Sequence, residues 1–365
     1  MPVLRHALQA QRSGTAGSLT APRGFPTGRA TTMDRTLIVA PSWVGDAILA
    51  EPLLAMLREP YEDPTIDVLA PPWCAPVFRR MRGVRRIIEH PMAHGRFELR
   101  ARRRIAADLR KEGYARAFVL PMSWKSALIP FLARIPRRIG YKGEARYVLL
   151  NDLRSLDRKA YPRLVDRFGA LAGPPGTRVP MPPAPVLVPD TANRDAAIRQ
   201  LRLRGEGPVA ILCPGAEFGP AKRWPPTHFA DLARRLIEVG ARVWLLGSPN
   251  DRMATDAVIA AAGDSARSLR DLTGKTDLGT AIDLMSAAAV VVSNDSGLMH
   301  AAAAIGAPLV ALFGSSSPVY TPPLSPLARI ARIEIECSPC FKRECPLGHF
   351  RCMREMSVDQ VLKLL

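Results

Sequence analysis

A proline-rich segment near the middle of the chain most limits the folds that these 365 residues can adopt. Seven prolines fall among the 18 residues from 173 to 190. Proline breaks helices and removes a hydrogen bond from an inner strand, so neither element fits here. The segment is therefore expected to be a semi-rigid linker. It divides the chain into two parts that are each large enough for a domain of ordinary size.

Strand and helix patterns alternate on both sides of this segment. In the first part, strands are predicted at 36–40, 65–69, 86–88 and 116–120, with helices at 47–58, 98–112 and 123–133. In the second part, strands are predicted at 208–213, 242–246, 268–272, 290–293 and 308–313, with helices at 226–240, 251–262, 278–288 and 297–305. This alternation predicts an α/β protein with two facing, doubly wound, Rossmann-like domains, 33–172 and 191–365, and a cleft between them.

The first 32 residues form a different kind of sequence. They are rich in Ser, Thr, Gly and Arg, contain no acidic residue, and lack the apolar core of a secretory signal. Met33 directly precedes the first strand pattern. We expect residues 1–32 to be a disordered basic leader. No stretch of eighteen apolar residues occurs, so no transmembrane helix is expected either.

The positive charge is concentrated in one region of the chain. The formal net charge is +18, and between residues 79 and 167 basic residues outnumber acidic ones roughly threefold. Such a field attracts an anionic partner, whether nucleic acid, an anionic membrane surface or a phosphorylated substrate. Nucleic acid fits poorly, because the aromatic residues of this region are few and scattered and no recognised reading module is present. The predicted contacts to the partner are Arg100, Arg102, Arg103 and Arg104.

Three loops that follow strands carry residues suited to chemistry, and ligands of such sheets bind at the carboxyl ends of strands. In the first, Gly45 permits a tight turn and Asp46 stands at a helix start. Asp46 is either a helix cap or a general base that takes a proton from an acceptor hydroxyl. In the second, Gly215 lets backbone amides approach a ligand, and Lys222 either binds a phosphate or is a solvated surface residue.

The third loop opens into a helix after a strongly apolar strand. Ser296 and Gly297 form a turn whose free amides suit an anion. Asp295 is better suited to a sugar hydroxyl or to a turn-stabilising hydrogen bond, and His300 is expected to be structural. No dinucleotide fingerprint or P-loop is present, which removes the main support for an oxidoreductase or a kinase.

The order and spacing of these loops, together with the segment 337–346, resemble the lipopolysaccharide heptosyltransferases of glycosyltransferase family 9, most closely the heptosyltransferase II group. The likeness runs from about residue 35 to residue 365. It implies a GT-B fold and inverting transfer of L-glycero-D-manno-heptose from ADP-heptose to the heptose–Kdo–lipid A inner core. Heptosyltransferases I and III, which differ in acceptor, remain alternatives.

The resemblance also implies roles for particular residues. Asp46 would be the general base, Lys222 would neutralise the ADP diphosphate, and Asp295, Ser296 and Gly297 would hold phosphate and heptose. Ser248 lies in the loop that would contact the adenosine ribose. No cofactor and no catalytic metal are implied, and the enzyme would work at the cytoplasmic face of the inner membrane as a peripheral protein.

Four cysteines near the C-terminus are not explained by this assignment. Cys337, Cys340, Cys345 and Cys352 fall within sixteen residues, with His349 among them. The density suits a metal site, but the spacing matches no familiar zinc template. A bound metal, reduced structural thiols and a disulfide all remain open.

Overall fold

The computed structural model describes residues 30–32, 34–63, 65–90, 97–177 and 179–365. Contacts divide these residues between Val188 and Pro189 into an N-terminal and a C-terminal domain. The division falls inside the proline-rich segment 173–190. Val186 donates its amide to Glu51 and Val188 donates to the carbonyl of Arg80, so the segment is still part of the N-terminal domain at these two residues.

The N-terminal domain is built on a six-stranded sheet in which every neighbouring pair is parallel. Its strands, in spatial order, are β5 (Val84–Glu89), β4 (Ile66–Ala70), β2 (Thr36–Val39), β6 (Arg116–Val119), β7 (Arg137–Tyr141) and β8 (Asp152–Arg154). Its helices are α2 (Val44–Leu49), α3 (Glu51–Arg58), α4 (Ala75–Arg79), α5 (Leu99–Lys111), α6 (Trp124–Leu132) and α7 (Leu164–Gly169).

Several features of this domain differ from the sequence prediction, which also lacked α4 and α7. The helix predicted at 47–58 is in fact two helices, α2 and α3. Pro52 lies in the first turn of α3, where proline favours the start of a helix. Strands β7 and β8 were not predicted, since β7 begins with two arginines and β8 has only three residues. Residues 30–32, at the end of the predicted leader, form the short strand β1 (Ala30–Thr32), which pairs with β3 (Tyr61–Asp63). The rest of the predicted leader lies outside the described residues.

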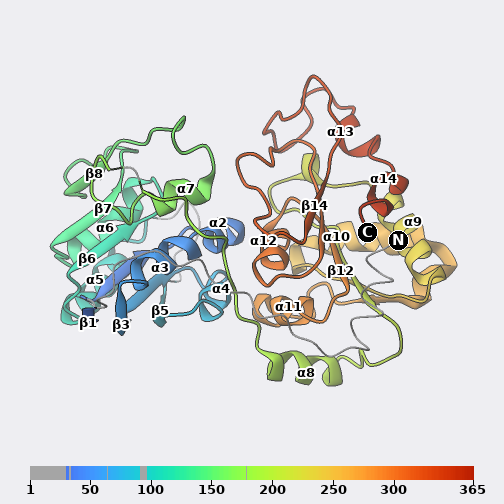
Figure 1. The fold of residues 1–365 in the computed structure, drawn as a ribbon, viewed down its shortest axis with the longest axis horizontal. Helices are drawn as coiled ribbons and strands as arrows, with labels where there is room; N and C mark the ends of the chain where they lie inside the picture. The colour runs from blue at the N-terminus through green and yellow to red at the C-terminus, as the bar shows by residue number, and fades with distance from the viewer. Residues whose placement is uncertain (1–29, 33, 64, 91–96, 178) are drawn as a thin grey trace. The chain divides into compact units, whose positions relative to one another are not determined.

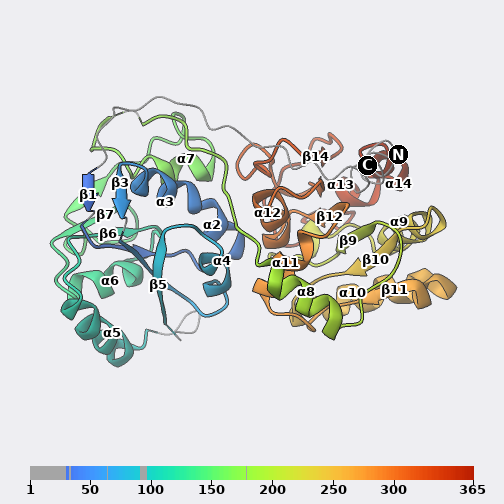
Figure 2. The ribbon, with the colours of Figure 1, turned by 60° about the horizontal axis from the view of Figure 1, so that its bottom comes forward.

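The C-terminal domain repeats this architecture. Its parallel strands, in spatial order, are β11 (Leu269–Asp271), β10 (Arg242–Leu245), β9 (Val209–Cys213), β12 (Val290–Asn294), β13 (Leu309–Leu312) and β14 (Ala328–Ala331). Its helices are α8 (Thr191–Gln200), α9 (Pro226–Glu238), α10 (Arg252–Ala262), α11 (Leu278–Met285), α12 (Gly297–Ala304), α13 (Arg351–Arg354) and α14 (Val358–Leu362). Helices lie on both faces of the sheet (Figures 1 and 2).

Both sheets have the strand order 3-2-1-4-5-6 when strands are counted along each domain. In this doubly wound order the chain reverses direction across the sheet between the first and the fourth strand, and ligands bind at the carboxyl ends there. The reversal falls between β2 and β6 in one domain and between β9 and β12 in the other. Asp46 follows β2, while Lys222 and Asp295 follow β9 and β12.

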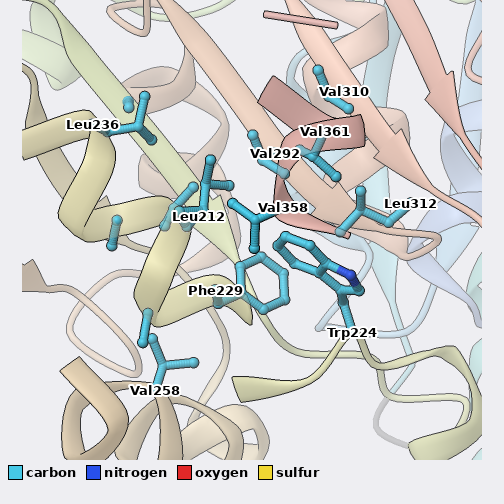
Figure 3. Packing of buried hydrophobic residues seen from close by; sticks show 14 of the residues in the cluster. Leu212, Trp224, Phe229, Leu236, Val258, Val292, Val310, Leu312, Val358 and Val361 are labelled. Atoms are coloured by element: carbon cyan, nitrogen blue, oxygen red, sulfur yellow. The ribbon is translucent and has the colours of Figure 1, made fainter. Parts of the chain in front are cut away.

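The core of the C-terminal domain includes a residue of a predicted ligand loop. Trp224 is buried and stands 5.0 Å, ring centroid to centroid, from Phe229 at a near-perpendicular angle (Figure 3). Its indole N–H donates to the carbonyl of Met356 at 2.8 Å. Because a buried tryptophan removes a large apolar area from water, it anchors the end of the loop that carries Lys222.

None of the helices in the described part of the chain is long and apolar enough to cross a membrane.

Candidate functional site

Lys222 and Asp295 meet at the carboxyl edge of the C-terminal sheet. The ammonium of Lys222 donates to Oδ2 of Asp295 at 2.5 Å, and both side chains are largely buried. Lys222 ends a 3-10 turn, Pro220–Lys222, in the loop after β9, and Asp295 directly follows β12. The two residues predicted to contact the donor are therefore adjacent. Lys222 is an ordered ion-pair partner rather than a solvated surface lysine.

Asn294 joins the two loops that carry this pair. Its side chain is fully buried at the end of β12. The amide nitrogen donates to the carbonyl of Pro214 at 2.9 Å, and the amide oxygen accepts from the backbone N–H of Trp224 at 3.0 Å. Sequence reasoning did not single out this residue. The sequence feature that could have indicated it is a polar residue at the end of an apolar strand, directly before Asp295.

His300 lies on α12 and is 6 % exposed. Burial lowers the pKa of its imidazole to about 4; the charge of Lys222 lowers it further, while Asp295 opposes this shift. The ring is therefore neutral at physiological pH. A neutral, packed histidine behind the ion pair agrees with the structural role expected for it.

Gly215 and Ser248 meet at Asp251, on the neighbouring strand ends. Asp251 accepts hydrogen bonds from the amide and the hydroxyl of Ser248, at 2.9 and 2.8 Å. A Cβ atom on Gly215 would lie 2.0 Å from Oδ1 of Asp251, so only glycine fits against this carboxylate. Ser296 and Gly297 begin α12 beside Asp295. All six residues predicted to bind the donor thus follow β9, β10 or β12, which are adjacent in the sheet.

A segment close to the C-terminus supports the Lys222 loop. The Phe218 ring lies 4.9 Å from the ammonium of Lys222 and 5.4 Å from the guanidinium carbon of Arg343. Ala221 donates its amide to the carbonyl of Arg343 at 3.0 Å. Gly219 has φ of +151° and packs so closely on Arg343 that a Cβ would lie 2.5 Å from that carbonyl oxygen. Nothing in the local sequence indicated this long-range contact.

In the N-terminal domain, Asp46 is half-buried in the first turn of α2. The N-cap residue of this helix is Trp43, so Asp46 is not the N-cap itself but an acidic residue of the first turn. Burial and the nearby Asp46 carboxylate raise the pKa of the Cys74 thiol to about 12. The Cys74 thiol is therefore neutral at physiological pH.

Two tryptophans border the loop that leads to Asp46. Trp43 is 40 % exposed and Trp73 is 43 % exposed. The indole N–H of Trp73 donates to the carbonyl of Ser42 at 2.8 Å, which ties the loop after β4 to the loop after β2. Exposed, oriented aromatic rings are suited to contact with a sugar, since they combine an apolar face with a polar edge. Sequence reasoning missed Trp73, because it stands 31 residues from Ser42.

The four arginines of the predicted acceptor patch separate into two kinds. Arg100, Arg103 and Arg104 are exposed near the start of α5. Arg102 is only 7 % exposed and donates to the carbonyls of Phe97 and Lys125, both at 2.8 Å. Burial lowers the pKa of its guanidinium. Arg102 therefore links α5 to α6, and only the other three arginines face solvent.

The cysteines of the described residues are all free. The same residues hold no group of three His, Cys, Asp or Glu side chains that is already arranged to bind a metal ion.

Two Rossmann-like parallel sheets in one chain, each with polar side chains at its switch point, define a glycosyltransferase architecture of the GT-B class. The family model described as glycosyltransferase family 9 (heptosyltransferase) matches residues 102–351, which is more than half of the chain. The chain belongs to this family.

Relatives match nearly the whole chain. Lipopolysaccharide heptosyltransferase 2 of Escherichia coli (strain K12) is 43 % identical over 338 residues, which cover 91 % of this chain and 97 % of the relative. Lipooligosaccharide heptosyltransferase 2 of Haemophilus influenzae is 44 % identical over 339 residues, with coverage of 90 % and 97 %. The solved structure of E. coli ADP-heptose lps heptosyltransferase II matches with a TM-score of 0.81 at 40 % identity, over 90 % of this chain and 97 % of that one. The predicted fold class and enzyme class are thereby confirmed.

Proposed function

We propose that this glycosyltransferase moves L-glycero-D-manno-heptose from ADP-heptose to the heptose–Kdo–lipid A inner core, with inversion at the anomeric carbon. The observation that carries the proposal is the Lys222–Asp295 ion pair at the switch point of the C-terminal sheet. The E. coli ADP-heptose lps heptosyltransferase II matches the fold over 90 % of this chain, which supports the choice of donor.

The C-terminal domain binds the donor in this proposal. The diphosphate of ADP carries several negative charges, and one more charge develops on it as the bond to heptose breaks. A cation fixed in advance near this group stabilises that charge without moving. Lys222 provides the cation, and Asp295 fixes its position at 2.5 Å. Ser296 and Gly297 offer backbone amides at the start of α12, while Gly215 and Ser248 border the nucleoside part.

The N-terminal domain binds the acceptor. A sugar hydroxyl is too weak an acid to ionise at neutral pH, so a carboxylate takes its proton as the new bond forms. Asp46, in the first turn of α2 after β2, is the carboxylate that acts as this general base. The exposed rings of Trp43 and Trp73 flank the same loop and offer apolar faces to the acceptor sugar.

The exposed basic residues give the acceptor domain its attraction for an anionic membrane. Inner-core lipopolysaccharide bears phosphates and carboxylates next to a lipid surface. Arg100, Arg103 and Arg104 lie near the start of α5, where their charges are open to solvent. We place the enzyme at the cytoplasmic face of the inner membrane as a peripheral protein. Each exposed arginine contributes modestly, and the group acts mainly through its long-range field.

The transfer step proceeds without a cofactor or a catalytic metal in this proposal. Lys222 supplies the positive charge that a metal ion would otherwise supply at the leaving diphosphate. The ion pair and the buried Asn294 hold that charge in place. A heptosyltransferase I or III reaction would use the same donor machinery and differ only in the acceptor. The two relatives that are 43 % and 44 % identical over about nine-tenths of this chain are named heptosyltransferase 2, which favours the second-heptose acceptor.

The test is a transfer assay with ADP-heptose and three defined acceptors: Kdo–lipid A, heptose–Kdo–lipid A and diheptosyl–Kdo–lipid A. Mass spectrometry reports each product, and nuclear magnetic resonance reports the anomeric configuration. We expect one heptose to be added to heptose–Kdo–lipid A alone, in the presence of a chelator. Addition to one of the other acceptors would reassign the enzyme to type I or III, and no addition to any of the three would refute the proposal.

A further inference from the structure

The residues between β14 and α13 form a segment without helix or strand. We call the residues from Cys337 to Cys352, the last of which lies in the first turn of α13, the cysteine segment. It is largely exposed apart from its sulfur-bearing residues, yet it packs on the loop that holds Lys222 through Arg343. Short irregular segments of this kind bury too little apolar area to be stable alone, and proteins commonly fix them with a disulfide or a metal ion. No disulfide is present among the described residues.

All four cysteines of the segment line one small cavity. Its volume is about 20 Å³, which suits a single atom or ion but not an organic ligand. The lining includes Cys337, Cys340, Cys345 and Cys352. Ser315 lies on the same wall, is 1 % exposed, and its hydroxyl has no hydrogen-bond partner within the described residues. A small pocket lined by four cysteines and an unsatisfied buried hydroxyl suits an occupant that polar groups can bind.

The backbone around Cys345 is arranged for a negatively charged sulfur. The amide of Phe350 donates to Sγ of Cys345 at 3.4 Å, and the amides of Leu347, Gly348 and His349 also face this atom. Amide donors of this kind stabilise a metal-bound thiolate, because they share the charge that the metal does not neutralise.

His349 is placed to support the cluster rather than to bind a metal directly. Its Nδ1 accepts the backbone amide of Arg351 at 3.0 Å. A neutral ring with an accepting Nδ1 carries its proton on Nε2. Nε2 lies 4.0 Å from Sγ of Cys337, so this N–H faces the sulfur. The ligand set is therefore four sulfurs, with the imidazole as a hydrogen-bond donor to one of them.

We propose that Cys337, Cys340, Cys345 and Cys352 bind one structural zinc ion as four thiolates. Four sulfur ligands in a tetrahedral arrangement select zinc or iron over harder ions. In the described residues the side chains do not yet stand in a binding arrangement. Each cysteine has one side-chain torsion, and the proposal requires that rotation about it turn the four sulfurs toward the cavity that these residues line. Each thiol that binds releases its proton to solvent, and zinc undergoes no redox change.

The proposed zinc site would hold the loop that carries Lys222 in place through a backbone contact. Ala221, next to Lys222, donates to the carbonyl of Arg343, and this carbonyl lies between Cys340 and Cys345 in the sequence. Phe341 donates its amide to the carbonyl of Ser315 at 2.7 Å, which ties the segment to the loop after β13. A zinc ion bound by the four cysteines would therefore also fix the Arg343 carbonyl that accepts the hydrogen bond from Ala221. The ion has no role in bond breaking.

The experiment measures metal in the full-length protein, purified without a polyhistidine tag and desalted on a metal-free column. Elemental analysis for zinc and iron is made on the wild type, on Cys340→Ser, on Cys345→Ser and on Cys213→Ala. Cys213 is a buried cysteine of β9 outside the segment, so it controls for the loss of a thiol alone. Cobalt added to metal-stripped wild type supplies a second readout, through its intense thiolate-to-cobalt absorption.

We expect about one zinc per chain in the wild type and in Cys213→Ala, and at least a tenfold loss in both segment variants. Cobalt is expected to give the tetrathiolate spectrum in the wild type only. If a cysteine variant fails to fold, metal-stripped wild-type protein is used instead. Its reactive thiols are then counted before and after zinc is added back. Four thiols protected by zinc would support the site. Wild type with neither zinc nor a cobalt–thiolate band would overturn the proposal, and so would iron at full occupancy.

Discussion

The ammonium of Lys222 lies 2.5 Å from Oδ2 of Asp295, although 73 residues separate them in the chain. The pair is possible because β9 and β12 are neighbours in the sheet, so their following loops meet at one edge. Both side chains are largely withdrawn from water, at 17 % and 4 % exposure. Removing one member leaves the other charge without its partner in a poorly solvated place.

Lys222→Ala is expected to weaken ADP-heptose binding and slow transfer, by roughly tenfold to a thousandfold together. The reason is the loss of the fixed cation at the leaving diphosphate. Calorimetric titration with ADP measures the first effect, and the transfer rate at saturating acceptor measures the second. Lys275→Ala is the matched control, because Lys275 is an exposed lysine of the same domain that also contacts an aspartate. Equal donor affinity and rate in the two variants would reduce Lys222 to a structural residue.

Gly215→Ala is expected to weaken donor binding, because the new methyl group would stand 2.0 Å from Oδ1 of Asp251. Either the loop after β9 or the Ser248–Asp251 hydrogen bonds must move. Overpacking of this kind typically costs about 1–3 kcal/mol in unfolding free energy. The double variant Gly215→Ala with Asp251→Ala removes the clash, so its thermal unfolding midpoint should be higher than additivity of the single variants predicts. Strict additivity would show that the two side chains are not coupled.

Sequence patterns predicted the architecture of both domains because apolar strands with loops at their ends are local features. Nearly every strand of the C-terminal sheet was predicted within one or two residues, and β12, with five buried residues, is an example. Strands β7, β8 and β14 were missed because charged residues or short length conceal them. Parallel pairing supplies their stability, and it cannot be read from one segment.

The candidate site was predictable in its residue types but not in its pairings. Lys222 and Asp295 were singled out separately, and only the sheet order shows that they form an ion pair. Arg102 has the same local sequence character as Arg103, yet one is buried and the other exposed, because the α5 surface has an inner and an outer side. The support from Arg343 depends on a loop more than a hundred residues away and carries no local signal.

Stability is expected to fall as the pH is lowered below about 6.5, in part because of His300. Burial holds the pKa of this ring near 4 in the folded protein, while the unfolded chain titrates near 6.5. Between these values only the unfolded state takes up the proton, so the stability present above pH 6.5 is lost as the pH falls toward 4. The loss from this residue is on the order of 3 kcal/mol. His300→Gln should flatten the dependence of the denaturant midpoint on pH, and an unchanged slope would contradict the assignment.

The exposed arginines of α5 are expected to govern acceptor binding and its salt dependence. Replacing Arg100, Arg103 and Arg104 together by glutamine should raise the apparent acceptor constant roughly tenfold at low salt. The effect should shrink as salt screens the charges, and ADP affinity should hardly change. Three exposed arginines of the other domain, Arg199, Arg202 and Arg270, replaced in the same way, form the matched control. If donor binding suffers in the α5 variant instead, the substrate roles of the two domains must be exchanged.

Asp46→Asn tests the general base most directly. Asp46 is the third residue of α2, and asparagine has nearly the same shape and keeps an oxygen that can accept a hydrogen bond, so the helix is expected to persist. What it loses is the ability to take a proton from the acceptor hydroxyl. We expect normal folding, nearly normal ADP binding and a transfer rate lower by roughly a hundredfold or more. Asp108→Asn removes an exposed carboxylate from the same domain and should keep the wild-type rate. The rate measured with heptose–Kdo–lipid A decides the matter: turnover near that of Asp108→Asn in a folded Asp46→Asn enzyme would leave the reaction without its base.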